Sequence, residues 1–125
     1  MRDALNATGR PIFYSLCSWG TDNVDEWGNL VGNSHRTTQD INSSWRSIRS
    51  NYLQSQQNYM NAGPGNWNDP DMLEVGVGAL TFQEEMTQFS LWAFAKAPLI
   101  IGADIRSADQ HSLDILKNDE LIAIN

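Results

Sequence analysis

The chain has 125 residues, of which 41% are hydrophobic and 18% are charged, and its formal net charge at pH 7 is −7. This composition is typical of a globular protein and excludes an intrinsically disordered chain, because disordered chains combine low hydrophobicity with high net charge. The negative charge argues against binding to nucleic acid or to an anionic membrane surface, and no apolar run approaches the roughly 20 residues of a membrane span.

The first third of the sequence predicts two strands separated by a long loop. Residues 2–8 are interpreted as the end of a helix, because a glycine and a proline follow them. The apolar run 12–16 predicts a buried strand. Residues 20–33 are rich in Gly, Asp and Asn and predict a loop, whereas residues 34–40 are polar but tolerate extended backbone and predict a second strand.

The middle of the sequence predicts one amphipathic helix and a third extended segment. We expect Asn42 or Ser43 to cap this helix, whose apolar side chains recur every three or four residues at Trp45, Ile48 and Tyr52. The sequence Ala-Gly-Pro-Gly predicts a turn over residues 62–65. Residues 66–73 follow it and are predicted to be extended.

The last third of the sequence predicts two helices and one strand. Thr81 and Glu84 have the spacing of a capping box, and the helix that they open ends before an Ala-Pro pair. Residues 99–102 predict a fourth strand. Ser107 and Gln110 repeat the capping-box spacing and predict the start of a last helix.

This order of elements predicts the α/β class, with parallel strands and helices packed outside them. Each strand–helix unit spans about 30 residues, and four such units make half of a (β/α)₈ barrel of about 250 residues. The alternative is an open doubly wound sheet. No glycine-rich phosphate loop follows any predicted strand, which argues against a nucleotide-binding version of that sheet.

Polar and aromatic side chains gather where the predicted strands end, which is where parallel barrels place their active sites. Carboxylates form strong hydrogen bonds with hydroxyl groups, tryptophans offer an apolar surface to a sugar ring, and a glycosidase needs two carboxyl groups. The pattern alone therefore indicates a polar pocket suited to carbohydrate. The side chains in question are Cys17, Ser18, Trp19, Arg36, Asp40, Trp67, Asn68, Asp69, Asp71, Met72, Asp104 and Arg106.

Four blocks of sequence carry a resemblance to a known family. They are GRPIFYSLCSWG at 9–20, NSHRTTQDI at 33–41, AGPGNWNDPDML at 62–73 and KAPLIIGADIR at 96–106. In this order they resemble barrel strands five to eight of glycoside hydrolase family 27, and the plant and fungal α-galactosidases are the most similar members. Together the blocks are far more specific than any single short motif.

The resemblance implies a role for each matching residue. Asp40 corresponds to the general acid/base, which protonates the leaving oxygen and then activates water. Arg36 corresponds to a sugar-binding residue beside that carboxylate. The other matches are to positions that line the sugar, namely Cys17, Ser18 and Trp19 after the fifth strand and Asp71 and Met72 after the seventh. No cofactor and no metal is implied.

The resemblance also implies that residues 1–125 are the C-terminal half of a TIM barrel catalytic domain. The upstream half, with a nucleophilic aspartate in a Tyr-Cys-Asp-like context, and a C-terminal β-sandwich would lie outside this chain. The implied reaction is retaining hydrolysis of terminal α-linked galactose from oligosaccharides, galactomannans or glycoconjugates by double displacement. We expect this chain to carry the acid/base but not the nucleophile, and to be inactive alone.

Two positions depart from the family pattern and leave alternatives open. His35 stands where tryptophan is common, and Ser18 stands where glutamate or asparagine is frequent. A serine there helps to accommodate an acetamido group in the related α-N-acetylgalactosaminidases, which are the first alternative. A non-catalytic carbohydrate-binding relative is the second alternative, and an unrelated parallel α/β domain is the third.

Several of these residues also have purely structural interpretations. Asp40 would stabilise the N-terminus of the helix that follows it, and Arg36 would serve as an ion-pair partner. Asp69 is interpreted as a turn residue, and Asp104 with Arg106 as a structural pair. The two histidines, His35 and His111, are isolated in the sequence and do not form a metal site, and Cys17, the single cysteine, is expected to be chemically passive.

Localisation is an expectation from the family. Its members point to an extracellular or a vacuolar–lysosomal protein, and two glycosylation triplets, at Asn6 and Asn42, favour secretion only weakly. The expected partner is a galactose-containing carbohydrate, and the oligomeric state stays open.

Overall fold

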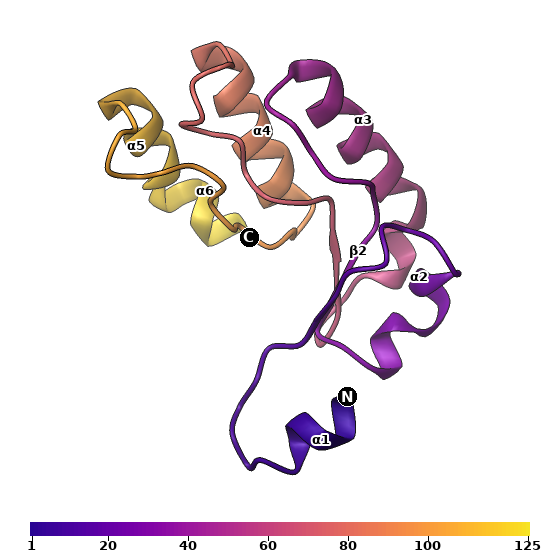
Figure 1. The fold of residues 1–125 in the computed structure, drawn as a ribbon. Helices are drawn as coiled ribbons and strands as arrows, with labels where there is room; N and C mark the ends of the chain where they lie inside the picture. Colours follow the sequence, from indigo (N-terminus) through magenta and orange to yellow (C-terminus); the bar gives the residue numbers. More distant parts are fainter.

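The computed structural model describes residues 1–125 and contains three short strands and a series of helices (Figure 1). The strands are β1 (Ser15–Leu16), β2 (Ser34–Arg36) and β3 (Trp67–Asp69). The α-helices are α1 (Arg2–Asn6), α2 (Val24–Trp27), α3 (Trp45–Ser55), α4 (Phe82–Phe94), α5 (Gln110–Leu116) and α6 (Asp119–Ile124). Two 3₁₀ helices complete the chain, η1 (Gly28–Leu30) and η2 (Gln56–Asn61).

The three strands form one parallel sheet in the order β1-β2-β3. Ser15 pairs with Ser34, and Arg36 pairs with Asp69, so the carboxyl ends of the strands lie at the same edge. Beyond β3, Leu73 forms a single parallel bridge with Ile101. The prediction of a parallel α/β arrangement is therefore confirmed, whereas the predicted strand at 99–102 is reduced to one bridge.

Helix α4 lies between α3 and α5 (Figure 1), and the apolar core joins these three helices to the segment that follows β3. Burial of each large apolar side chain contributes about 1.5–3 kcal/mol to stability. The ring centroids of Tyr52 on α3 and Trp92 on α4 lie 6.3 Å apart, and this contact joins the two longest helices. The core cluster consists of Ile48, Leu73, Val75, Phe89, Trp92, Ala97 and Ile115.

The capping box predicted at the start of α4 is confirmed. The Thr81 hydroxyl accepts from the backbone N–H of Glu84 at 3.4 Å, and the Glu84 carboxylate accepts from the backbone N–H of Thr81 at 2.8 Å. These two bonds satisfy donors that the first turn of a helix leaves without intrahelical partners.

Two other predicted caps are wrong. Helix α3 is capped by Ser44, whose hydroxyl accepts from the backbone N–H of Ser47, rather than by Asn42 or Ser43. Helix α5 is capped by Asp109, because Asp109 directly precedes the helix and its carboxylate reaches the backbone N–H of Ser112 at 2.8 Å.

The predicted strand at 12–16 is mostly wrong. Only Ser15 and Leu16 pair with β2, and the side chains of Ile12 and Phe13 are 41% and 62% exposed. The backbone of Tyr14 is bound instead to Asn33 through both its N–H and its carbonyl, so the segment before β1 follows a loop rather than a second strand.

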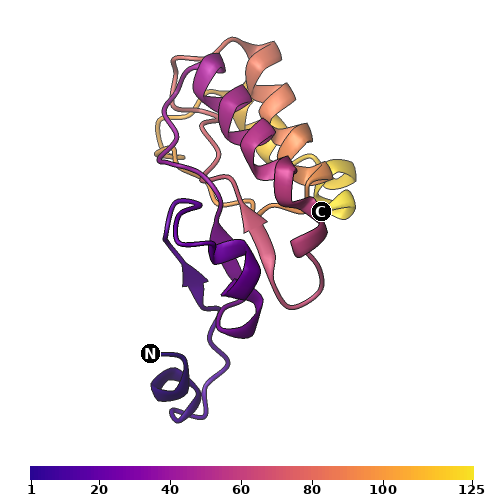
Figure 2. The same cartoon turned by 90° about the vertical axis from the view of Figure 1, so that its right-hand side faces the viewer.

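Two helical segments were not expected from the sequence. The predicted loop 20–33 contains α2 and η1, where Val24 is buried. Residues 119–124 form α6, capped by the Asn118 side chain. Helix α1 lies at the far end of the molecule from α4, α5 and α6 in both views (Figures 1 and 2). None of these helices has the length and apolar character needed to cross a lipid bilayer.

Candidate active site

The residues predicted to carry the chemistry lie at the carboxyl edge of the sheet. Cys17 follows β1, Arg36 ends β2, and Asp71 follows β3. Because the strands are parallel and in register, these positions converge although they are far apart in the sequence. The fold thus brings together the predicted residues of three separate sequence blocks.

Arg36 is the centre of the cluster. Its side chain is only 10% exposed, and Nη2 lies 2.7 Å from Asp71 Oδ2 and 3.1 Å from Asp40 Oδ1. The same nitrogen donates to the carbonyl of Thr38 at 3.3 Å, and Nη1 lies 3.9 Å from Cys17 Sγ. One guanidinium therefore links two carboxylates and a thiol, which the fixed geometry of its donors permits.

Asp40 is the open member of the cluster. Its side chain is 75% exposed, and Oδ1 accepts both from Arg36 and from Trp19 Nε1 at 3.1 Å. The second oxygen, Oδ2, accepts no hydrogen bond from the protein. A carboxyl group held through one oxygen and free at the other can exchange a proton with a molecule that approaches from solvent.

Trp19 reaches Asp40 because the chain turns sharply after β1. Trp19 and Gly20 both have positive φ angles, of 54° and 73°. A side chain on Gly20 would meet the carbonyl oxygen of Thr37 at 2.2 Å, so only glycine permits this close approach. The Trp19 ring is 45% exposed and offers an apolar surface at the edge of the cluster.

Asp71 is the closed member of the cluster. Its side chain is 8% exposed, Oδ2 accepts from the backbone N–H of Ile41 at 2.8 Å, and Oδ1 accepts from that of Met72 at 2.8 Å. Its φ angle is +88°, which is unusual for a residue other than glycine. The strained backbone is held by its N–H donating to Asp69 Oδ1 at 2.8 Å and by its carbonyl accepting from Trp92 Nε1 at 2.7 Å.

Two acids beside this cluster have pKa values above their ordinary range. Burial raises the pKa of Asp69, although the hydrogen bond from Asp71 and the charge of Arg36 partly oppose the effect. Burial and then the nearby charge of Asp71 raise the pKa of Glu74. Asp69 acts on the backbone of Asp71, which agrees with its predicted structural role, whereas Glu74 was not singled out in the sequence.

The remaining predicted contacts lie around the rim. Cys17 and Met72 are exposed, and Met72 follows Asp71 directly. The Ser18 hydroxyl oxygen is buried and has no hydrogen-bond partner in the protein. Asn51 and Trp92 contact the backbone beside the two aspartates, but their helical positions carry no sequence signal for such a role.

Other polar groups lie outside the cluster. Asp104 and Arg106 form an exposed pair at 2.7 Å, which agrees with their structural interpretation. Hydrogen bonds from Arg106 hold the pKa of Asp104 below its usual value.

His35 is fully buried, and its Nδ1 lies 2.8 Å from Asn66 Oδ1. No group of three or more His, Cys, Asp or Glu residues is placed to hold a metal ion.

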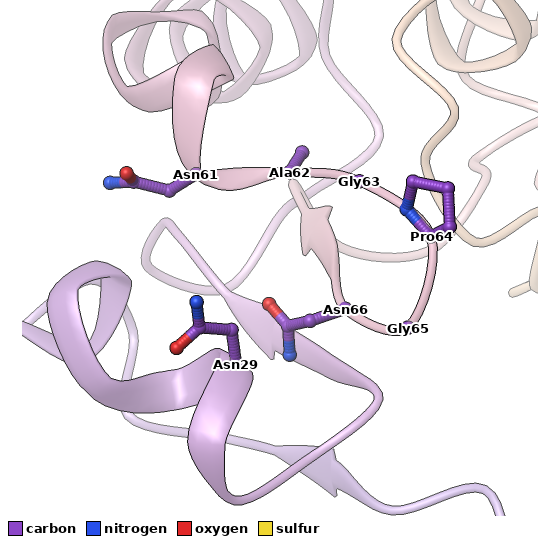
Figure 3. Close-up of a pocket in the computed structure, with 7 residues that line it drawn as sticks. All are labelled: Asn29, Asn61, Ala62, Gly63, Pro64, Gly65 and Asn66. Carbon is purple, nitrogen blue, oxygen red and sulfur yellow. The ribbon is translucent and has the colours of Figure 1, made fainter.

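A separate polar pocket of about 310 Å³ lies at the opposite end of the strands (Figure 3). Asn29 comes from η1, and Asn66 directly precedes β3. The pocket is lined by Asn29, Asn61, Ala62, Gly63, Pro64, Gly65 and Asn66, and none of these side chains is charged. It therefore contains no group that could act as a nucleophile or as a general acid.

Comparisons with known proteins cover the whole chain. The family described as "Alpha galactosidase A" matches residues 1–125. The chain is 54% identical over 125 residues to "Alpha-galactosidase 3" of Arabidopsis thaliana, which covers 100% of the chain and 29% of that protein. It thus spans about a third of the length of the curated relatives it matches.

Solved structures agree with the sequence matches. An α-galactosidase of Saccharomyces cerevisiae superposes with a TM-score of 0.96 and 40% identity, over 99% of this chain and 32% of that one. A structure of α-galactosidase from the same yeast with raffinose gives a TM-score of 0.88 and 40% identity, over the same shares.

Proposed function

This chain belongs to the alpha galactosidase A family, and we propose that the full-length protein containing it is a retaining α-galactosidase. Its substrates would be oligosaccharides, galactomannans or glycoconjugates that end in α-linked galactose. The curated relatives named as α-galactosidases and the yeast structure with raffinose support this choice. The observation that carries it is the Arg36 network, which joins an open and a closed carboxylate.

The proposal includes the position of the chain in the complete fold. The parallel β1-β2-β3 sheet with outer helices would form strands five to seven of a (β/α)₈ barrel, and the bridge at Ile101 would mark the eighth. Coverage of about a third of each relative supports a longer protein. In that protein the first half of the barrel would precede these residues and a β-sandwich would follow them.

Asp40 would act as the general acid and then as the general base. Retaining hydrolysis needs one carboxyl group to protonate the leaving oxygen and a second one to attack the anomeric carbon. Asp40 has a free oxygen and an exposed side chain, which suit the first role. The nucleophile would come from the first half of the barrel, and water activated by Asp40 would then release the sugar.

The other residues of the cluster would bind the galactose. Arg36 and Asp71 would bind sugar hydroxyls through the small exposed part of each side chain, 10% and 8%, and Trp19 would offer an apolar ring face. Cys17, Ser18 and Met72 would line the remainder of the sugar-binding site. Cys17 Sγ lies 3.9 Å from Arg36 Nη1, and Ser18 and Met72 directly follow Cys17 and Asp71 in the sequence.

The proposal is tested by Asp40→Asn in the full-length protein. Loss of a general acid/base lowers the rate by about 10²–10⁴-fold, so we expect a loss of that size in kcat/KM for raffinose. The matched control is Asp104→Asn, which removes another exposed, arginine-paired carboxylate outside the cluster and should leave kcat/KM unchanged. Unchanged hydrolysis by Asp40→Asn would contradict the assignment.

An α-N-acetylgalactosaminidase is the second candidate, because a serine at this position helps to accommodate an acetamido group in that related family, and the Ser18 hydroxyl has no hydrogen-bond partner in the protein. We expect the full-length protein to prefer aryl α-galactoside over aryl N-acetyl-α-galactosaminide. The reverse preference, abolished by Ser18→Glu, would establish the second candidate instead. A non-catalytic carbohydrate-binding relative would hydrolyse neither substrate.

We also propose an extracellular or vacuolar–lysosomal location for the full-length protein. Asn6 and Asn42 of the two glycosylation triplets are both exposed, so either could accept a glycan in the secretory pathway. Removal of N-linked glycans from protein purified from its own source should increase its electrophoretic mobility. If removal of N-linked glycans changes the electrophoretic mobility of neither the wild type nor the Asn6→Gln variant, the protein does not carry such glycans, and the proposed location loses its support.

A further inference from the structure

One side chain of helix α3 contacts the peptides that precede both site carboxylates. Asn51 Nδ2 lies 3.1 Å from the carbonyl oxygen of Gln39 and 3.1 Å from that of Pro70. Gln39 immediately precedes Asp40, and Pro70 immediately precedes Asp71. We propose that Asn51 is a positioning residue that fixes the separation of Asp40 and Asp71, a role that rests on the function proposed above.

A side chain is required at this place because the backbone ladder ends there. Strands β2 and β3 pair up to Arg36 and Asp69, and the last backbone bond runs from the N–H of Thr37 to the carbonyl of Asp69 at 2.9 Å. The next residue on the β3 side is Pro70, which has no N–H and cannot extend the ladder. Beyond this point the two segments are joined by side chains.

Asn51 is the one side chain that donates to a carbonyl in each of the two segments, the one after β2 and the one after β3. Thr38 Oγ1 donates to the carbonyl of Pro70 at 3.3 Å, and Gln54 Nε2 donates to that of Thr37 at 3.0 Å, so each reaches one carbonyl only. Asn51 is 7% exposed, so water competes little for its donors. Both of its partners are acceptors, which fixes the amide with its nitrogen toward them.

The contact matters most for Asp40. Asp71 is held through both carboxylate oxygens and both backbone polar groups, whereas Asp40 is exposed and held through one oxygen. The Asn51 bond to Gln39 therefore limits how far Asp40 can move from the sugar that Asp71 and Arg36 would hold. A displacement of about 1 Å in a catalytic group can cost about 10²-fold in rate.

The test compares two substrates that differ in their need for a general acid. The sugar leaving group of raffinose must be protonated as it departs, whereas para-nitrophenolate leaves with little assistance. In the full-length protein, we expect Asn51→Leu to lower kcat/KM for raffinose by at least about tenfold and that for the para-nitrophenyl α-galactoside by less than about threefold. A merely structural role would lower both by the same factor.

Asn68→Leu is the matched control. Asn68 is 4% exposed, and its Nδ2 also donates to two carbonyls, those of Ser55 at 3.4 Å and Asn58 at 3.0 Å. We expect its two kcat/KM values to change by one common factor. If either leucine variant fails to fold, Asn51→Ser and Asn68→Ser replace the pair, because a serine side chain is too short to reach both carbonyls.

The outcomes separate this inference from the function on which it rests. A ratio of the two kcat/KM values that changes in Asn51→Leu but not in Asn68→Leu supports the inference. Equal losses on both substrates in Asn51→Leu overturn it while the enzyme assignment stands. Failure of the assignment itself is seen independently, as full hydrolysis by Asp40→Asn or no hydrolysis by the wild type.

Discussion

At the scale of single residues, Arg36 interacts with two aspartates in opposite environments. The Asp71 contact is buried on both sides, at 10% and 8% side-chain exposure, whereas the Asp40 side chain is 75% exposed. Exposed ion pairs contribute about 0–1 kcal/mol, but removal of one partner from a buried pair costs about 3–5 kcal/mol. The contribution of Arg36 to stability therefore comes mainly from its contact with Asp71, and the contact with Asp40 contributes little.

This asymmetry predicts different costs for removing each partner. Arg36→Met should lower the free energy of unfolding by about 3 kcal/mol, because Asp71 would remain buried without its cation. Asp40→Asn should lower it by less than about 1 kcal/mol. Chemical denaturation of the full-length variants measures both values. Equal losses of unfolding free energy in Arg36→Met and Asp40→Asn would contradict the prediction that the buried contact with Asp71 stabilises the protein more than the exposed contact with Asp40.

Asp69 predicts a pH dependence of stability. Its pKa is raised in the folded state, chiefly by burial, from an ordinary value of 3.8. The folded state therefore binds the proton of Asp69 more tightly than the unfolded state does. The contribution of this protonation to stability is complete below the ordinary pKa and is lost as pH rises through the raised pKa of the folded state. Asp69→Asn is neutral at every pH and still accepts from the backbone of Asp71, so it should gain stability over wild type as pH rises through this window.

The control for this prediction has the opposite sign. Hydrogen bonds from Arg106 lower the pKa of Asp104, so its contribution is present above the ordinary pKa and is lost as pH falls through the lowered one. Thermal melts across the acid range should therefore show the stability difference of Asp104→Asn changing in the other direction. Parallel pH profiles for the two variants would contradict the assigned cause.

The sequence predicted which polar side chains come together better than it predicted their surroundings. Arg36, Asp40 and Asp71 lie in blocks that end predicted strands, and parallel pairing brings such ends together. Asn51 could not be predicted, because its contact depends on how helix α3 packs over the end of the ladder. The exposure of Asp40 likewise depends on tertiary packing, which no local pattern encodes.

At the scale of elements, the helix starts depend on which side chain directly precedes the first turn. Thr81 with Glu84 was predicted because the complete capping box is local in sequence. Ser107 with Gln110 has the same spacing, but the Ser107 hydroxyl donates to the carbonyl of Asp104 instead. A residue that is already engaged in the preceding turn cannot cap the helix, and Asp109 takes its place.

This difference predicts unequal effects for two neighbouring substitutions. Asp109→Ala should destabilise the protein measurably, because it removes the cap of α5 and a carboxylate from the positive end of that helix. Ser107→Ala should change stability by less than about 0.5 kcal/mol. The free energies of unfolding of the two variants can be compared directly, and a larger loss for Ser107→Ala would contradict the observed cap.

At the scale of the whole molecule, large apolar side chains lie on the surface around a short sheet. Phe13 is 62% exposed, Phe94 is 66% exposed, and Ile100 is 50% exposed. The strands have two or three residues each, although the sequence predicted longer ones. The apolar runs at 12–16 and 99–102 are only partly paired here, and we expect their exposed side chains to be buried by neighbouring segments of a longer protein.

We predict that the 125 residues expressed alone are poorly stable or prone to aggregation. Exposed apolar side chains and the unpaired outer edges of β1 and β3 favour association with other copies. Thermal denaturation and light scattering of the isolated chain measure this directly. A single sharp cooperative transition without aggregation would contradict the prediction, and it would show that the α3–α4 core suffices for independent folding.

The hydrogen bonds of Trp19 and Trp92 give the Arg36 network two built-in spectroscopic reporters. The indole N–H of Trp19 is bound to Asp40 at the exposed end, and that of Trp92 is bound to the carbonyl of Asp71 at the buried end. Indole N–H resonances are resolved from the amide region in proton–nitrogen correlation spectra. If galactose binds to the network, the indole N–H resonance of Trp19 should shift directly. A movement of the Asp71 backbone should shift the indole N–H resonance of Trp92, which lies in the core.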